Sequence, residues 1–350
     1  MQGTKAKIKQ TNFALLNREV IKPEYCILCG GCESVCPMNV ILIEQMRPKL
    51  VGGCISCGSC VDICLRINQR VDQPAVSDDL GPILEVYLGK SAKNDIHQNA
   101  QNGGIVTSLL LSALKNNSID GALVTIGGKD LSHPIPMLAC TEEEIRSASR
   151  SKYTQNPALS NLDSIKSSYK KSVAVVGLPC HMETLTQFVK KQYLGTDNRI
   201  KYQIGLFCMS SYKPDSFRDI VKQELGLDFK DITKTDCGRG KFFFETKDGL
   251  KEAKINLFHA GKPEGCKYCK DFSAEFADIS IGNVGVDDDM NIVIIRTEAG
   301  KELFQNVLES NYLNVEKIEQ PKWSEVLMLA NKLSSSKKKN AKPSALEIIV

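Results

Sequence analysis

The chain has 350 residues, of which 42% are hydrophobic and 25% are charged, and its formal net charge is +4. This composition is ordinary for a globular protein, and the length suits two domains better than one. The small net charge does not favour a nucleic-acid partner, and no apolar run approaches the roughly 20 residues that cross a bilayer. Because no apolar segment follows Lys5, Lys7 and Lys9, we predict no signal peptide and expect a cytoplasmic protein. Any membrane association would be peripheral, through partner subunits.

Fourteen cysteines are present, and eight of them stand in two blocks with the spacing C-x2-C-x2-C-x3-C. The blocks read CILCGGCESVC at residues 26–36, followed by Pro37, and CISCGSCVDIC at residues 54–64, followed by Leu65. This is the bacterial-type ferredoxin run, in which three cysteines of a block hold one cubane and the fourth ligates the other. We therefore predict two [4Fe–4S] clusters, one on Cys26, Cys29, Cys32 and Cys64 and one on Cys54, Cys57, Cys60 and Cys36.

Zinc sites and disulfides are the alternatives for these cysteines. Structural zinc takes its four ligands in two pairs, so the fourth cysteine of each block would be left over. Disulfides are not expected in a cytoplasmic chain. The spacing thus favours two clusters.

The blocks also suggest how the chain divides. We expect residues 1–22 to be an arm that leads into the first ferredoxin strand, and residues 23–72 to be a dicluster ferredoxin domain of βαββαβ order. Residues 71–82 have two prolines and no helical period, which suits a linker. Residues 81–333 are expected to form the larger domain. The basic segment 334–350 is interpreted as a flexible tail or, because it ends in LEIIV, as a partner-docking arm.

Strands and helices alternate beyond residue 83, which predicts an α+β fold with a mixed sheet. Thr141 and Glu144 fit a capping box, and Lys247, Asp248 and Gly249 fit the turn of a hairpin. The predicted strands lie at residues 84–89, 121–128, 172–180, 200–208 and 291–297, and the predicted helices at 103–117, 142–149, 181–192, 214–226 and 299–310.

The remaining six cysteines include a second candidate ligand set. Cys180 and Cys208 each end an apolar strand, and Cys266 and Cys269 form a C-x2-C pair. Strand ends lie side by side at one edge of a sheet, so these four cysteines are plausible ligands for a third cluster. Ordinary buried cysteines are the alternative. We interpret Cys140 as a core residue and leave Cys237, in a glycine-rich turn, outside the ligand set.

Two polar segments suggest an anionic, aromatic cofactor. Gly103 and Gly104 precede a predicted helix, where exposed N–H groups make either an anion site or a plain helix start. Residues 147–156, SASRSKYTQN, form either a solvated loop or a loop across such a cofactor. In the second interpretation Lys152 contacts charge and Tyr153 or Gln155 contacts a ring edge.

Five segments occur in the order typical of the coenzyme F420 hydrogenase/dehydrogenase beta-subunit family. They are QNGGIVTSLL, SASRSKYTQN, VVGLPCHMETL, GLFCMSSY and CKYCKDFSAEFADISIGNVG, and the resemblance runs from about residue 81 to 308. With two ferredoxin clusters in front, the chain is most similar to the F subunits of dehydrogenases that oxidise reduced F420. The resemblance implies that the larger domain binds FAD and that Cys180, Cys208, Cys266 and Cys269 hold a [4Fe–4S] cluster. It also implies FAD contacts from Gly103, Gly104, Val106, Thr107, Lys152 and Tyr153.

The implied activity is hydride transfer from reduced F420 to FAD, followed by single-electron transfer through the clusters to a partner subunit or a ferredoxin. No side chain is needed as acid or base, so no catalytic residue is predicted. The reverse direction stays open, and His181, where relatives often have glutamine, has no assigned role. One alternative is a ferredoxin-dependent reductase of another organic substrate, and another is a pure electron carrier. The F420 interpretation requires a cationic groove, for which the candidates are Arg150, Lys152, Arg239 and Lys241.

Overall fold

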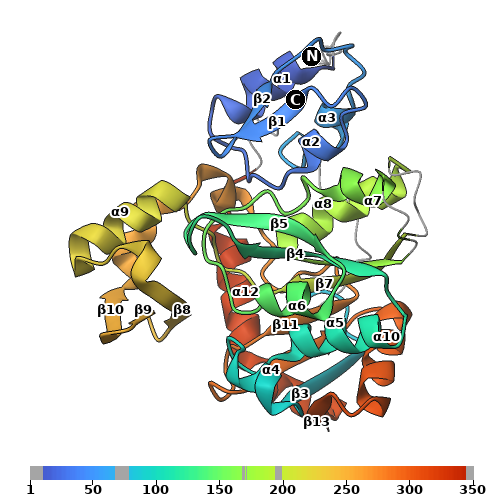
Figure 1. Cartoon of the computed structure of the whole chain (residues 1–350), viewed down its shortest axis with the longest axis vertical. Coiled ribbons are helices and arrows are strands. Elements are labelled where there is room, and N and C mark those ends of the chain that lie inside the picture. The colour runs from blue at the N-terminus through green and yellow to red at the C-terminus, as the bar shows by residue number, and fades with distance from the viewer. Residues whose placement is uncertain (1–10, 68–78, 168–169, 171, 194–198, 344–350) are drawn as a thin grey trace, which may run out of the picture.

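The computed structural model describes residues 11–67, 79–167, 170, 172–193 and 199–343. Most of the predicted linker, the first ten residues and the LEIIV end of the predicted tail lie outside the described residues. Figure 1 shows the ferredoxin domain at one end of the molecule, above a large sheet, with a smaller sheet projecting to one side.

The large sheet has eight strands in the order β13-β3-β12-β11-β7-β6-β4-β5. Strands β11, β7, β6 and β4 are parallel neighbours, and the other pairs are antiparallel. The mixed sheet predicted from the sequence is thus confirmed. Its strands are β3 (Glu85–Ser91), β4 (Gly121–Gly127), β5 (Pro134–Ala139), β6 (Val173–Gly177), β7 (Ile200–Leu206), β11 (Ile279–Gly282), β12 (Asn291–Ile295) and β13 (Leu313–Ile318).

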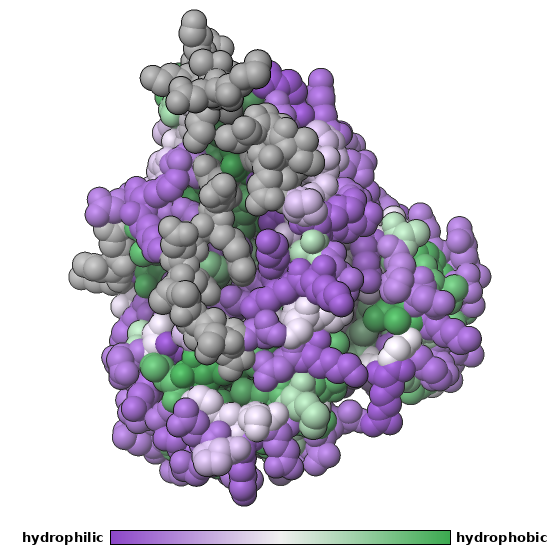
Figure 2. Space-filling model, turned by 180° about the vertical axis from the view of Figure 1, so that it is seen from behind, coloured by the Kyte–Doolittle hydropathy of each residue, from purple (hydrophilic) through white to green (hydrophobic). Residues whose placement is uncertain are grey.

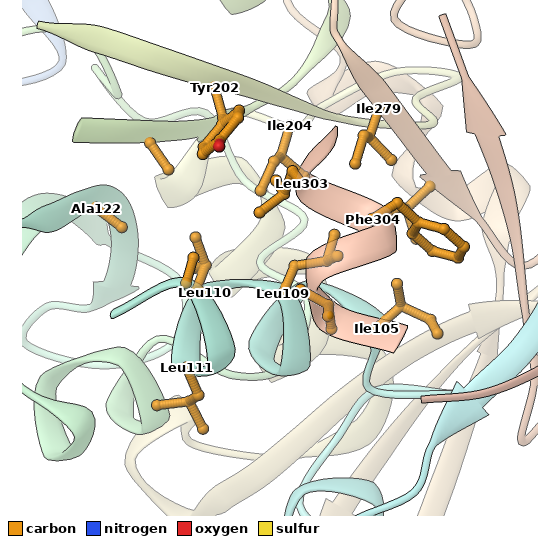
Figure 3. Packing of buried hydrophobic residues seen from close by; sticks show 14 of the residues in the cluster. Ile105, Leu109, Leu110, Leu111, Ala122, Tyr202, Ile204, Ile279, Leu303 and Phe304 are labelled. Carbon is orange, nitrogen blue, oxygen red and sulfur yellow. The ribbon is translucent and has the colours of Figure 1, made fainter. Parts of the chain in front are cut away.

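Helices cover both faces of this sheet because its strands are apolar on both sides. On β12, Val293 packs into the cluster formed with α5 and α10, whereas Ile292 packs into the cluster formed with α12. Figure 3 shows the first cluster, where Leu109 and Leu110 of α5 face Leu303 of α10. The helices around the sheet are α4 (Asn94–Gln98), α5 (Ile105–Lys115), α6 (Glu142–Ser147), α7 (Leu162–Ser167), α8 (Pro179–Lys190) and α10 (Glu298–Glu309). The predicted capping box of α6 is present.

The ferredoxin domain has fewer strands than predicted. Its described part contains the hairpin of β1 (Ile41–Glu44) and β2 (Arg47–Leu50) and the short helices α2 (Gly31–Ser34) and α3 (Ser59–Asp62). The expected outer strands of a βαββαβ order are not formed in the described residues. Their segments contain left-handed residues at matching places in the internal repeat, with φ of 56° at both Leu28 and Ser56, and such angles interrupt an extended strand.

The predicted arm is partly helical and buried. Helix α1 (Phe13–Leu16) continues into η1 (Asn17–Ile21), and the apolar side chains of both are covered. They share one hydrophobic cluster with α8 residues such as Leu185 and Phe188. The ferredoxin domain therefore packs directly on the larger domain. Residues 13–21 of the predicted arm are helical and form part of this joint core.

Gly30 lies tightly against the backbone of the larger domain. Its φ is +89°, and a Cβ there would lie 2.4 Å from Ser160 N. We expect Gly30→Ala to lower the unfolding free energy by at least about 2 kcal/mol, or roughly 4 °C or more in Tm, because the left-handed angle and the overlap add. Gly53→Ala is the matched control, since a Cβ at that position would have no other atom within 4 Å. Equal Tm values for the two variants would contradict this role of Gly30.

A three-stranded sheet and α9 (Pro214–Leu225) form a second, aromatic core. The strands are β8 (Ile232–Gly238), β9 (Lys241–Thr246) and β10 (Gly249–Lys254), with η2 (Phe229–Asp231) before them and η3 (Ile255–Gly261) and η4 (Glu264–Tyr268) after them. The predicted hairpin is confirmed, with Thr246 opposite Gly249. Phe217 of α9 packs against Phe242 and Phe258 at ring distances of 5.1 and 4.9 Å.

After β13 the chain continues through η5 (Gln320–Lys322), α11 (Trp323–Val326) and α12 (Met328–Asn340), and α12 packs against the large sheet. The interpretation of the segment from residue 334 as a flexible tail is therefore wrong up to residue 340. Ser334 and Lys337 are buried within α12, and Ala330 belongs to the cluster beneath it. The apolar side of this helix packs on the sheet, although its last turn contains three consecutive lysines.

No described helix is both long and apolar enough to cross a membrane. Figure 2 shows the opposite face of the molecule, where hydrophilic residues surround small apolar patches.

Candidate functional site

The eight ferredoxin cysteines line two separate cavities. We call the first the proximal cavity; it measures about 450 Å³ and is lined by Cys26, Cys29, Cys32 and Cys64. The second, the distal cavity, measures about 330 Å³ and is lined by Cys36, Cys54, Cys57 and Cys60. The fold thus brings together the two crossed sets that the spacing predicts.

A third cavity, which we call the core cavity, lies at the edge of the large sheet and measures about 460 Å³. It is lined by the other predicted set, Cys180, Cys208, Cys266 and Cys269. Cys180 is the second residue of α8, Cys208 follows β7, and the C-x2-C pair spans the end of η4. Two parallel strands and one short helix therefore bring four thiols to one place, as their positions at strand ends suggest.

The thiols of all three cavities suit iron–sulfur clusters. Each cavity is lined by four cysteines, and all of these cysteines are free thiols. Burial raises the pKa of Cys26 and of Cys208 to about 12. A buried thiolate needs a cation beside it, and iron supplies that charge when a cluster binds. The donors present thus fit four-thiolate clusters.

The proximal cavity lies between the other two. Ile27 belongs to the first cysteine block but lines the core cavity, and the Cys29 thiol is close enough to Cys180 to raise its pKa further, after burial. The Thr184 hydroxyl, one helical turn after Cys180, lies near the Cys29 thiol and donates to Cys180 O at 2.8 Å. The Arg66 guanidinium lines the proximal cavity and donates to Gly265 O at 3.4 Å, next to Cys266. These contacts connect the core and proximal cavities.

The distal cavity opens at the surface. Cys54 and Cys57 are exposed, and apolar side chains around them are exposed as well, with 58% for Ile55, 51% for Val51 and 49% for Met38. We call these three residues, together with Leu42 and Leu50, the distal apolar patch. Exposed apolar groups clustered around a redox site are typical of a protein-docking surface.

The glycines predicted to contact FAD lie at the start of α5. Gly104 is its N-cap with φ +76°, and Val106 and Thr107 are half-buried in its first turn. A Cβ on Gly103 would lie 2.7 Å from Asn291 Oδ1 and equally close to Gly89 O, so glycine is required here for backbone packing. Their role in FAD binding stays a prediction.

The loop with Lys152 and Tyr153 lies beside the core cysteines. Tyr212 N donates to Tyr153 O at 3.1 Å, and Gln155 N donates to Tyr212 O at 2.8 Å, which ties the loop to the segment after Cys208. Lys152 Nζ donates to Ala148 O and Ser149 O, both at 2.7 Å, at the end of α6. Burial lowers the pKa of Lys152 to about 7. The Tyr153 hydroxyl donates to Asp236 at 3.3 Å.

The segment before α5 and the Lys152 loop each contain a buried polar side-chain atom. Gln101 Nε2 and Thr154 Oγ1 are buried and make no hydrogen bond in the described structure. Gln101 precedes the α5 glycines, and Thr154 follows Tyr153. Free donors in both segments fit a bound group that accepts hydrogen bonds, such as a cofactor rich in carbonyl and phosphate oxygens.

The side chains predicted to form a cationic groove each have a different partner in the structure. Arg150 donates to Thr233 O at 2.9 Å, and Arg239 pairs with Asp288 at 3.3 Å beside the start of α5. Lys241 is paired with Glu252 across the hairpin. Sequence reasoning missed Lys234, whose Nζ donates to Gln101 O at 3.3 Å, because nothing in its strand pattern distinguishes it from an ordinary exposed residue.

His181 lines the core cavity as a buried, neutral ring. Its Nδ1 accepts a hydrogen bond from Leu178 N at 3.1 Å, so its proton is on Nε2. Burial lowers its pKa to about 4. Cys140 and Cys237 line none of these three cavities.

Comparison with known proteins decides the family. Residues 86–163 match the N-terminal model, and residues 170–321 the C-terminal model, of the coenzyme F420 hydrogenase/dehydrogenase beta subunit, while residues 18–65 match a 4Fe-4S dicluster domain. The chain is 34% identical to the coenzyme F420 hydrogenase subunit beta of Methanothermobacter thermautotrophicus, over 75% of this chain and 94% of that one. The chain belongs to the coenzyme F420 hydrogenase/dehydrogenase beta-subunit family.

Other proteins similar to this chain differ from it in length. The F subunit of the F(420)H(2) dehydrogenase from Methanosarcina mazei is 29% identical over 92% of this chain and 91% of its own length. A coenzyme F420-dependent sulfite reductase of Methanocaldococcus jannaschii is 32% identical over 86% of this chain, which spans only 49% of that protein. A chain of the F420-reducing [NiFe] hydrogenase complex from Methanosarcina barkeri superposes with a TM-score of 0.71 and 28% identity, over 77% of this chain and 92% of that chain.

The two matched family regions each contain part of the candidate site. The N-terminal family region contains the α5 glycines and the Lys152 loop, and the C-terminal region contains all four core cysteines. Lys337, which also lines the core cavity, lies beyond both regions. Sequence reasoning missed it because it stands in a basic run, which is typical of a solvent-exposed segment.

Proposed function

We propose that the protein oxidises reduced coenzyme F420 and delivers the electrons singly at the distal apolar patch. Family membership supports the substrate, because relatives are named as F420 hydrogenase, F420H2 dehydrogenase and F420-dependent reductase components. The dicluster domain supports electron transfer. The acceptor is a partner subunit or a ferredoxin, since the matched relatives include subunits of larger enzymes.

The observation that carries this proposal is the serial order of the three cavities. The core cavity is lined by residues of the C-terminal family region, such as Cys180 and Cys208. The proximal cavity contacts it through Ile27 and Cys29, and the distal cavity opens at the surface. An interior entrance and an exposed outlet, joined by a buried intermediate site, form a path for electrons. A structural metal protein has no need of such an order.

Reduced F420 gives a hydride whereas clusters take one electron, so bound FAD would supply the conversion between them. The chain's own residues hold these groups in place. Leu28 N and Ser56 N each point at a cysteine sulfur, Cys26 and Cys54, at 3.4 Å, and such hydrogen bonds tune a cluster.

The proposed entrance for F420 lies between the start of α5 and β8. Arg150, Lys234 and Arg239 gather there around Gln101 and Asn102. The phosphate and glutamate groups of the F420 tail are negative, so these side chains would attract it. Electron flow in the opposite direction uses the same residues.

The test is anaerobic reconstitution of the full chain with iron, sulfide and FAD, followed by mixing with reduced F420. We expect the visible flavin and cluster absorption to bleach within seconds. No reaction with reduced F420, together with reduction by a reduced ferredoxin, would contradict the proposed substrate.

A further inference from the structure

Lys337 is a buried lysine that reaches the core cavity from the C-terminal helix α12. Its residue exposure is 8%, and it lines the cavity together with the four core cysteines. Its Nζ donates to Cys208 O at 2.5 Å and to Asp271 O at 2.7 Å. These bonds hold the ammonium between the segment after β7 and the segment after the C-x2-C pair.

The described residues give this ammonium no salt-bridge partner within 4 Å. The charged or ionisable groups facing it are Asp271 and the thiols of Cys208, Cys266 and Cys269. A buried cation is costly without an opposite charge. Four thiolates around a cluster carry a net negative charge, so a loaded core cavity would supply that charge.

The helix around Lys337 is anchored on both sides, to Asp79 before the large sheet and to the segment of the C-x2-C pair. Ser334 Oγ donates to Asp79 O at 2.7 Å. Beyond the helix, Lys342 N donates to Lys267 O at 2.8 Å, and Lys342 Nζ contacts Glu264 at 2.6 Å. Because Lys267 lies between Cys266 and Cys269, this end of the chain holds the ligand-bearing turn and the lysine in register.

We propose that Lys337 is a positioning residue that raises the reduction potential of a cluster in the core cavity. Reduction adds one negative charge to the cluster, and a cation held at its edge stabilises that form more than the oxidised one. The role rests on the proposed function, because it requires the core cysteines to hold a cluster. It extends the site beyond the matched family regions, to the helix after residue 321.

The test is a redox titration of the reconstituted full chain followed by EPR, with iron counted in each variant. We expect Lys337→Met and Lys337→Gln to make the core cluster at least tenfold harder to reduce, which is about 59 mV for one electron. Lys337→Arg, which keeps the charge, should restore most of the wild-type value. Lys338→Met is the matched control, because its Nζ contacts Asp79 and Glu275 and not the cysteines.

The outcomes separate the two proposals. Three clusters with an unchanged core potential in both neutral variants would overturn the role of Lys337 and leave the proposed function intact. If Lys337→Met loses its core cluster, the reduction potential is measured in Lys337→Gln instead. This variant keeps an amide donor for the two carbonyls. A wild-type protein with only two clusters would overturn the core cluster itself and, with it, this role.

Discussion

Replacing Cys266 with serine is expected to remove one cluster and stop electron delivery to a protein acceptor. Three cubanes hold about twelve iron atoms, so the variant should retain about eight. Reduced F420 should then react with the flavin alone, and reduction of an added ferredoxin should fall to background. The physical reason is that the core cavity adjoins the proximal cavity, through Ile27 and Cys29, and so lies before it on the proposed electron path.

Cys140→Ser is the matched control for this experiment. Cys140 is also partly buried but lines none of the three cavities, and its thiol faces Leu138 O at 3.8 Å. This variant should keep its full iron content and activity. An unchanged iron count in Cys266→Ser would show that the core cysteines hold no cluster.

Replacing Ile55 with aspartate is expected to slow electron transfer to a ferredoxin by about tenfold or more, since a buried unpaired charge at an interface costs more than about 1.4 kcal/mol. Ile55 is 58% exposed and lines the distal cavity. Reduction of a small viologen dye should not change, because a dye needs no docking surface. The measurement is the rate with each acceptor at saturating reduced F420.

Leu250→Asp is the control for a general effect of surface charge. Leu250 is 65% exposed on β10, in the sheet that projects away from the ferredoxin domain. Its rates with ferredoxin and with dye should match those of the wild type. If Ile55→Asp slows both acceptors equally, the distal apolar patch is not a docking surface.

Much of the cysteine arrangement could be predicted because it depends on local spacing. The C-x2-C-x2-C-x3-C blocks fix which thiols can surround one cluster, and the structure groups them accordingly. Cys180 and Cys208 could be placed together because parallel strands end at the same edge of a sheet. The apolar runs of the larger domain also predicted strands β3, β4, β6, β7 and β12 of the large sheet.

The features that depend on tertiary packing could not be predicted. Phe13–Ile21 is too short to show a clear helical period, and its partners on α8 are distant in sequence. Lys337 belongs to a run of three lysines whose charge suggests solvent exposure, yet helical spacing turns only this one into the core cavity. The prediction of outer strands in the ferredoxin domain was wrong because left-handed residues such as Leu28 bend those segments around the cavities.

The segments predicted to contact FAD show where sequence patterns are insufficient. The glycine pair before α5 suggested a phosphate site, but Gly103 is explained by its contact with Asn291. The position of the Lys152 loop beside Cys208 depends on its pairing with Tyr212, which no local pattern predicts. The unpartnered donors of Gln101 and Thr154 are visible only in three dimensions.

The most direct test is the number of electrons that the reconstituted chain accepts from reduced F420 in an anaerobic titration. We predict about five electrons per chain, two for FAD and one for each of three clusters. Cluster EPR signals should develop during the titration, without any other reductant. Uptake of only about two electrons, with cluster signals appearing after dithionite is added, would contradict a continuous path from the F420 site to the ferredoxin domain.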